Sequence, residues 1–360
     1  MARLSILGGL GRKGPAAFLL EVEGRRILMD LGEGPVPGER PCLDKLGAVD
    51  ALVLSHAHMD HCGALDLHTR IGAPPVHASA ATWAQIPPER LAERHRVVVP
   101  LEGVAEVAGL AMRFGRSGHA LGGVWMRIDT PRGGLLYTGD WSVESEIFPF
   151  DPPPAASTLI VDASYGDRAQ ALEDQFDRIR AMAQGGAVLC VPAAGRGPEV
   201  ALRLARAGLS PKVCPVVARE IRLLAGDFES GCVPEIRAAL AAFAFALADG
   251  GTARPGDAIV ATEANAEAGL ATALRARLGE GFRFLFSSHV PAGTPAEALL
   301  QAGAAHWLGW NVHPRLGDVL DLADSCAARR VVPLFLNVSE APNLGAGLGD
   351  RLCLDRTIEV

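Results

Sequence analysis

Short runs of alternating apolar and polar residues dominate residues 1–168, which is the pattern of β-strands whose two faces differ. Ala17–Glu23 and Arg26–Asp30 flank Gly24-Arg25 and predict a hairpin with its turn at those two residues. Ala51–Leu54 predicts a buried strand, and Gly63–Arg70 a short helix behind it. Further strands are predicted at Val97–Val99, Ala111–Phe114, Val124–Ile128, Gly134–Thr138 and Leu159–Asp162.

The pattern changes after Arg168, where stretches of helix length alternate with short apolar strands. The predicted helices are Ala171–Gln184, Pro198–Ala207, Ala218–Ala225 and Pro295–Ala302, and the predicted strands are Ala187–Val191, Ala258–Ala261 and Phe282–Ser287. This βαβ rhythm predicts a mostly parallel sheet. Val331–Leu336 then returns to a strand. We therefore expect an α/β protein with a β-rich part at 1–168, an inserted α/β lobe at 169–305 and a segment at 306–360 that completes the first part.

Composition adds limits on the class of protein. The 360 residues suit two lobes or one layered domain, with 49% hydrophobic and 21% charged residues. No apolar run reaches the roughly 18 residues of a membrane helix, so no membrane association is expected. Seven cysteines without a CxxC pair predict a reducing, cytoplasmic location. The net charge of -7 is weak evidence against nucleic acid, because a local groove can be positive on an acidic protein.

The segment Ser55–His61 carries the densest chemistry, since it places three imidazoles and a carboxylate directly after a predicted strand. The candidate ligands are His56, His58, Asp60 and His61. Imidazole and carboxylate groups suit Zn²⁺ and similar ions. Four ligands this close cannot reach one tetrahedral ion without strain, so two ions sharing the cluster fit better. Two metals about 3.5–4 Å apart commonly activate water against a phosphate ester or an acyl group.

Two further residues can complete a site for two metals. His119 lies between glycines directly before a predicted strand, and Asp140 follows another predicted strand. Taken alone, each of these two residues is typical of a turn. Beside the cluster, however, each offers one missing ligand, and a carboxylate such as Asp140 can bridge two cations.

The order of these residues, from Asp30 through the histidine cluster to His119 and Asp140, resembles the metallo-β-lactamase superfamily. Gly118–Gly122, Thr138–Asp140, Asp162–Arg168 and Gly195–Glu199 resemble its β-CASP branch, which includes ribonuclease J, the mRNA 3′-end cleavage nuclease and Artemis-like DNA nucleases. The RNA-processing members are the nearer match. The resemblance implies an αββα sandwich with an inserted α/β β-CASP lobe.

The resemblance also implies a role for each matching residue. His56, His58 and His119 would hold one divalent metal, and Asp60 and His61 the other, with Asp140 bridging. Zn²⁺ is expected, with Mn²⁺ as an alternative at the second position. Asp162 would orient a metal-ligand histidine from behind, and His313 would serve as general acid or phosphate contact. Asp60, Asp162 and His313 are the candidate catalytic residues, and Asp30 is given a structural place without chemistry.

One departure concerns the late strand, which in the family usually ends in a metal-ligand histidine. Here Val331–Leu336 is followed by Asn337, whose oxygen is a weak ligand better suited to a hard cation. His306 and His289 are alternatives for the missing ligand. His68, His77 and His95 have no partner at ligand spacing and are predicted at the surface.

The leading hypothesis is a metal-dependent phosphodiesterase that hydrolyses RNA by means of a metal-activated water. Arg168, Arg196 and Arg315 are candidates to bind the substrate backbone. A DNA nuclease of the same branch, a small-molecule hydrolase of the wider superfamily and a degenerate non-catalytic partner are the alternatives. Family members are often dimers, so a homodimer is one of the expected forms, and the sequence leaves the oligomeric state open.

Overall fold

The structure is a computed structural model that describes residues 2–36, 38–44, 46–192, 196–226 and 231–360. It divides into two compact units. The first contains Met1–Val143, Phe148–Ala169 and His313–Val360, and the second contains Glu144–Ile147 and Gln170–Val312. The domain boundaries expected from the sequence stay a prediction, because compactness alone does not delimit a domain.

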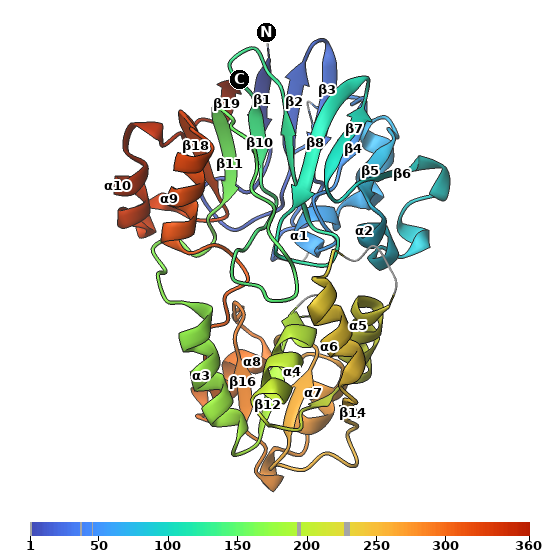
Figure 1. Ribbon diagram of the computed structural model, residues 1–360, viewed down its shortest axis with the longest axis vertical. Coiled ribbons are helices and arrows are strands. Elements are labelled where there is room, and N and C mark those ends of the chain that lie inside the picture. The colour runs from blue at the N-terminus through green and yellow to red at the C-terminus, as the bar shows by residue number, and fades with distance from the viewer. Residues whose placement is uncertain (1, 37, 45, 193–195, 227–230) are drawn as a thin grey trace. The chain divides into compact units, whose positions relative to one another are not determined.

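Two sheets form the centre of the first unit in the described part of the chain (Figure 1). One has the strand order β19 (Thr357–Glu359), β1 (Arg3–Ile6), β2 (Phe18–Val22), β3 (Arg25–Met29), β4 (Ala51–Val53), β5 (Val76–Ser79) and β6 (Arg96–Val99). The other has the order β18 (Arg330–Leu334), β11 (Thr158–Asp162), β10 (Leu135–Tyr137), β9 (Val124–Ile128), β8 (Leu110–Arg116) and β7 (Gly103–Val107).

The alternation of side chains along each strand builds the layers of this unit. In β4, Ala51 and Val53 join the core that also receives Met126 and Tyr137 from the opposite sheet. Leu52, on the other face of β4, packs in a second core with residues of the helical segments that follow the strand. A strand that is apolar on both faces, such as β4, is therefore covered on one face by the opposite sheet and on the other by helical segments.

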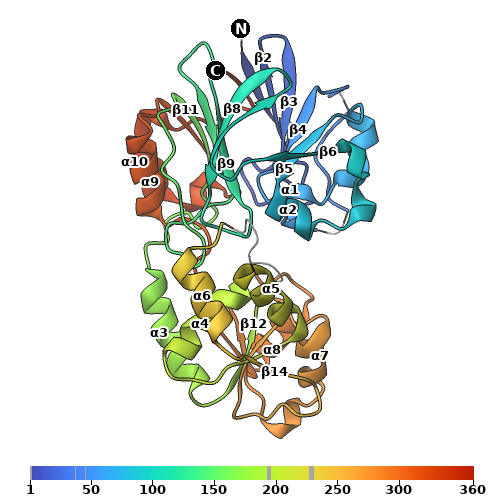
Figure 2. The same ribbon diagram turned by 45° about the vertical axis from the view of Figure 1, so that its right-hand side comes forward.

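Helices cover the outer face of each sheet. α1 (Met59–Cys62), a 3₁₀ helix over Leu65–Ile71 and α2 (Ala80–Gln85) supply the first cover, and α9 (Leu316–Ser325) and α10 (Pro342–Leu348) supply the second. Figure 2 shows α9 and α10 beside β11, and α1 and α2 near β5. The first unit is thus an αββα sandwich, as expected.

The second unit is built on one parallel sheet. Its order is β14 (Ala246–Leu247), β13 (Lys212–Val213), β15 (Ala258–Ala261), β12 (Ala187–Cys190), β16 (Phe284–Phe286) and β17 (Ala305–Trp307), and each described neighbouring pair is parallel. Its helices are α3 (Leu172–Ala183), α4 (Arg196–Arg206), α5 (Pro215–Ala225), α6 (Pro234–Ala242), α7 (Gly269–Arg275) and α8 (Pro295–Gln301). The predicted βαβ arrangement is confirmed.

Several local predictions are wrong in detail. The first hairpin turns at Glu23-Gly24, one residue earlier than predicted, because these two residues take the positive φ angles of 50° and 74° that a tight turn requires. The predicted helix at Gly63–Arg70 is a 3₁₀ helix at Leu65–Ile71. His68 is buried, since its Nε2 lies 2.7 Å from the carbonyl oxygen of Pro74, and His77 is buried within β5.

None of the helices in the described ranges combines the length and the apolar character needed to cross a membrane.

Candidate metal centre

The end of β4 leads directly into the histidine cluster. The chain leaves the strand at Val53, passes Leu54 and Ser55, and enters α1 at Met59. His58 is the N-cap residue of α1 and keeps an extended backbone without capping the helix through its side chain. Its imidazole is therefore not used for capping. Asp60 and His61 lie inside this single helical turn. Successive side chains leave a helix in different directions, so these two side chains do not point the same way.

His119 and Asp140 come from loops of the opposite sheet, and glycines let these loops approach closely. Gly118 has a φ of +72°, and a Cβ atom there would lie 2.0 Å from the carbonyl oxygen of Ser142. Gly139 has a φ of +56°, and a Cβ atom there would lie 2.7 Å from the Cβ of Ser55. Side chains larger than glycine at either position would displace the ligand that follows it.

The six predicted ligands come together in the structure. One ligand atom from each of His56, His58, His119 and Asp140 lies within 4.8 Å of the others. The same limit holds for Asp60, His61 and Asp140, and for Asp140, Asp162 and His313. Asp140 is the member shared by all three groups, which is the place a bridging carboxylate would take.

Buried polar atoms in these groups fit a bound cation. Nε2 of His56, Nε2 of His61 and Oδ1 of Asp140 are buried and have no hydrogen-bond partner among the described residues. Nε2 of His61 and Oδ1 of Asp140 lie only 3.1 Å apart. An unsatisfied buried polar group costs about 1–3 kcal/mol. A divalent ion between such atoms removes that penalty, so the donor set suits Zn²⁺ or a related metal.

Asp30 organises the side chains behind the cluster, and its contacts explain the structural place that the resemblance implied for it. Its carboxylate accepts hydrogen bonds from the backbone N–H of Ser55 (2.7 Å), the Ser55 hydroxyl (2.7 Å) and the Tyr137 hydroxyl (2.6 Å). It also lies 2.7 Å from Nδ1 of His61. An imidazole that donates through Nδ1 presents Nε2 as the ligand atom, so Asp30 orients His61 from behind.

Replacing Asp30 by asparagine should therefore lower both stability and metal affinity. Asparagine tolerates the positive φ of 58° at this position, so the backbone is kept. The loss of the charged acceptor should lower the free energy of unfolding by about 2–3 kcal/mol and weaken metal binding by about 10–100-fold. Denaturant unfolding and metal titration measure the two effects. Asp129→Asn, at a carboxylate that is 88% exposed, is the control and should change neither.

Burial and mutual repulsion set the protonation of the cluster. Burial lowers the pKa of His56 well below its usual value, and the neighbouring imidazoles lower it further. Burial alone would also lower the pKa of His61, but Asp140 and Asp30 raise it well above its usual value. Burial would raise the pKa of Asp60, yet His61 and Lys13 hold it below its usual value. His56 is thus neutral and Asp60 ionised at neutral pH, which are the forms that bind metals.

Asp162 and His313 form a pair at the edge of the cluster. Asp162 ends β11, and its Oδ2 lies 2.7 Å from Nδ1 of His313, which is 3.7 Å from Oδ2 of Asp140. Asp162 therefore orients His313, and its expected role behind a metal-ligand histidine stays a prediction. Burial would lower the pKa of His313, but Asp162 and Asp140 raise it to about 9. The imidazole is protonated at neutral pH and 16% exposed, which suits a proton donor.

The three candidate arginines have partners within the protein. Arg196 is buried in the second unit and donates to the hydroxyls of Ser287 (3.3 Å) and Ser288 (2.9 Å). Arg315 pairs with Asp318 at the start of α9, and Arg168 stacks over Tyr165 at 3.8 Å. Gly195, the first residue of the motif that contains Arg196, lies outside the described residues. Substrate binding by these arginines stays a prediction.

The late strand presents an aromatic ring to the cluster. Phe335, directly after β18, lies with its ring centre 5.6 Å from that of His61. Asn337 is exposed, and its side-chain oxygen accepts a hydrogen bond from the backbone N–H of Ser339. His306 and His289 are exposed residues of the second unit. Within the first unit the structure therefore brings Phe335 against His61, and a ligand role for Asn337, His306 or His289 stays a prediction.

Comparison with known proteins agrees with this geometry. The sequence profile of the Metallo-beta-lactamase superfamily matches residues 10–192. An RNase J-like protein of Methanocaldococcus jannaschii is 27% identical over 228 residues, covering 56% of this chain and 54% of that protein. Ribonuclease TTHA0252 of Thermus thermophilus is 31% identical over 179 residues, covering 42% of this chain and 41% of that protein. The chain thus matches about half the length of these relatives.

A crystal structure of a protein of unknown function from Enterococcus faecalis V583 has the same fold. Its TM-score is 0.63 at 13% identity, with 100% of both chains covered. The chain belongs to the metallo-beta-lactamase superfamily. Its αββα sandwich and its histidine cluster agree with this assignment. Within this superfamily, the chain belongs to the β-CASP branch, as its motifs and its inserted α/β unit indicated.

Proposed function

We propose that this protein is a metal-dependent ribonuclease that hydrolyses phosphodiester bonds in RNA. The observation that carries the proposal is the Asp162–His313 pair beside Asp140, because it places a proton donor next to a group of metal ligands. A hydrolase acting on a thioester or an activated ester expels a weakly basic leaving group and has less need for such a donor than one expelling a ribose oxygen. The ribonuclease names of the relatives support the choice of RNA.

Two divalent metals, preferably Zn²⁺, would occupy the centre. His56, His58 and His119 would hold one, Asp60 and His61 the other, and Asp140 would bridge them. When bound, such metals lower the pKa of water and stabilise the charge that develops on phosphorus oxygens.

The chain's own residues carry the proton transfer. Water adds to phosphorus and releases one proton to solvent, the bond from phosphorus to the leaving ribose oxygen breaks, and Nε2 of His313 gives its proton to that oxygen. Asp162 holds Nδ1 and stabilises the protonated imidazole before transfer. His313 then regains a proton from solvent. Asp30 keeps His61 oriented throughout.

The test compares labelled RNA, labelled DNA and a chromogenic ester in parallel, with Zn²⁺ or Mn²⁺ added. The proposal expects RNA cleavage to be fastest. Faster DNA cleavage would identify the DNA nuclease of the same branch, and hydrolysis of the ester alone would identify a small-molecule hydrolase. Failure to cleave any substrate, together with less than one bound metal, would favour a non-catalytic partner. Light scattering of the same preparation tests the expected homodimer.

The two metal positions should differ in affinity. The first group offers four protein ligands, whereas the second offers Asp60, His61 and the shared Asp140, with the ring of Phe335 against His61. After gel filtration in metal-free buffer we expect about one retained equivalent of Zn²⁺, with the second position filled by Zn²⁺ or Mn²⁺ only in excess. Phe335→His should raise the retained amount toward about two equivalents, and Phe335→Leu is its control. Two equally tight ions in the unchanged protein would contradict this asymmetry.

A further inference from the structure

A glycine-rich loop joins β1 to β2 and is attached to the metal centre at both ends. The carbonyl oxygen of Gly9 accepts a hydrogen bond from the backbone N–H of Phe335 (2.7 Å), the residue that packs on His61. At the other end, the N–H of Ala16 donates to the carbonyl oxygen of Asp60 (2.8 Å). Residues 10–15 therefore lie next to the second group of ligands, and Lys13 among them is one of the charges that act on Asp60.

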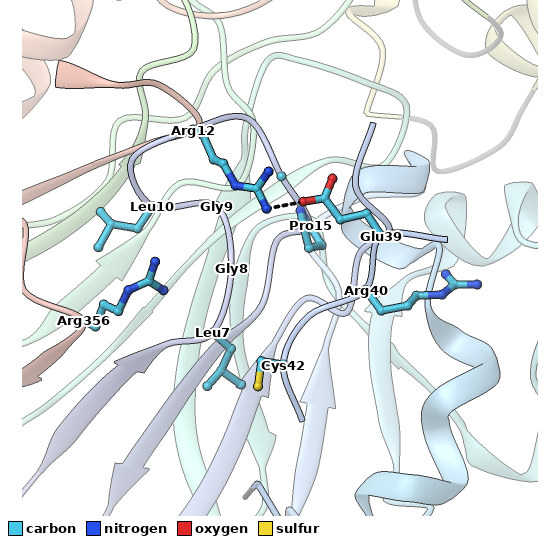
Figure 3. Close-up of a pocket in the computed structure, with 11 residues that line it drawn as sticks. Leu7, Gly8, Gly9, Leu10, Arg12, Pro15, Glu39, Arg40, Cys42 and Arg356 are labelled. Carbon is cyan, nitrogen blue, oxygen red and sulfur yellow. Dashed lines mark hydrogen bonds and ion pairs between the residues drawn. The ribbon is translucent and has the colours of Figure 1, made fainter. Parts of the chain in front are cut away.

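The same loop forms one wall of a pocket in the first unit (Figure 3). The pocket has a volume of about 180 Å³, and its other walls include Glu39, Arg40, Cys42 and Arg356. This volume is smaller than the roughly 300–1,000 Å³ of sites for whole small molecules. A phosphate group with part of a sugar is of the right size.

The charges around the pocket favour an anion. Arg12, which is 72% exposed, pairs with Glu39 at 2.6 Å, and Arg40 pairs with Glu33 at 2.9 Å. Arg356 lines the pocket, is exposed, and makes no ion pair with any residue in the described ranges. Its guanidinium is thus the positive charge that the protein leaves unneutralised at this pocket. Guanidinium groups bind phosphate oxygens through two parallel hydrogen bonds.

We propose that this pocket binds a backbone phosphate of the RNA strand, close to the phosphodiester that is cleaved. The proposal rests on the proposed ribonuclease function for its choice of ligand. Backbone hydrogen bonds join the loop that forms one wall of the pocket to Phe335 and to Asp60, which ties this wall to the segments that carry the second group of ligands. Arg356 and Arg12 are then specificity residues for a chain of nucleotides, which a single small ester would not contact.

The experiment measures binding of a fluorescent RNA oligonucleotide to the metal-free protein by anisotropy, so that cleavage does not enter. Arg356→Gln should weaken binding about 10-fold, and the slope of log affinity against log salt should fall by about 0.7. Glu39→Gln, which removes the negative charge, should strengthen binding. Arg94→Gln removes an exposed arginine that does not line the pocket and is the matched control.

Equal RNA affinity of the unchanged protein and Arg356→Gln would overturn the proposal, whether or not the protein cleaves RNA. A second arm uses inorganic phosphate in a thermal-shift assay. Stabilisation by phosphate that Arg356→Gln abolishes, without any loss of RNA affinity, would identify a site for free phosphate and also overturn it. Weakened RNA binding by Arg356→Gln in a protein that cleaves nothing would uphold the pocket and reject the ribonuclease function.

Discussion

Replacing Asp140 by asparagine is expected to abolish metal-dependent hydrolysis, because all three groups of candidate ligands share this carboxylate. Asparagine keeps the size of the side chain but removes the charge that would bridge two cations. Metal ions contribute several kcal/mol to stabilising the transition state, and each 1.36 kcal/mol corresponds to a factor of about ten in rate. We therefore expect kcat to fall by about 10³-fold or more, measured on labelled RNA with saturating Zn²⁺ or Mn²⁺.

Metal analysis of the same variant separates a ligand from a structural residue. Asp140→Asn should retain less metal than the unchanged protein after gel filtration, while its circular dichroism stays the same. Asp129→Asn, a change of the same kind at an exposed carboxylate, should keep both metal and activity. An Asp140→Asn protein with full metal content and full activity would show that Asp140 binds no catalytic metal.

The second large effect is expected at His313. Loss of a general acid lowers rates by about 10²–10⁴-fold, so His313→Ala should slow RNA cleavage by that amount. Hydrolysis of bis(4-nitrophenyl) phosphate, whose leaving group departs without a proton, should be affected much less. Asp162→Asn, which leaves the imidazole in place but removes its partner, should lower the rate about 10–100-fold. His306→Ala, at an exposed histidine of the second unit, is the control.

The pH dependence tests the same role. Asp162 and Asp140 overcome the effect of burial and raise the pKa of His313 to about 9. The acid form is therefore present at neutral pH and is lost as the pH rises through that value. Bound cations oppose this shift, so the alkaline fall in kcat should occur at or below about pH 9. The residual activity of His313→Ala should lack this fall. An equal loss on both substrates with an unchanged pH profile would instead indicate a structural role for His313.

The sequence was informative where ligands lie close together along the chain. His56, His58, Asp60 and His61 follow one strand, so their convergence could be predicted from local spacing. The Asp162–His313 pair is separated by 151 residues, and only the motif resemblance pointed to both members. Its hydrogen bond depends on how β11 and the segment before α9 meet, which no local pattern encodes.

Other features required the three-dimensional contacts. Asp30, Ser55 and Tyr137 form their network because β3 and β4 are neighbours in one sheet and β10 belongs to the sheet that faces them. The hydrogen-bond partners of Arg196 and Arg315 also could not be predicted from the sequence. The sequence therefore did not distinguish exposed arginines from buried ones. Strands of two residues, such as β13 and β14, are too short for a period to emerge. The helices α9 and α10 were not predicted, because the apolar strand Val331–Leu336 was the one element assigned in residues 306–360.

The most direct test of the account titrates the metal-free protein with Zn²⁺ or Mn²⁺ and follows bound metal and RNA cleavage in the same samples. We predict no cleavage without metal and a rate that rises as the two positions beside Asp140 fill. Cleavage by the metal-free protein at the full rate would contradict the account, as would a fully loaded protein that leaves RNA intact.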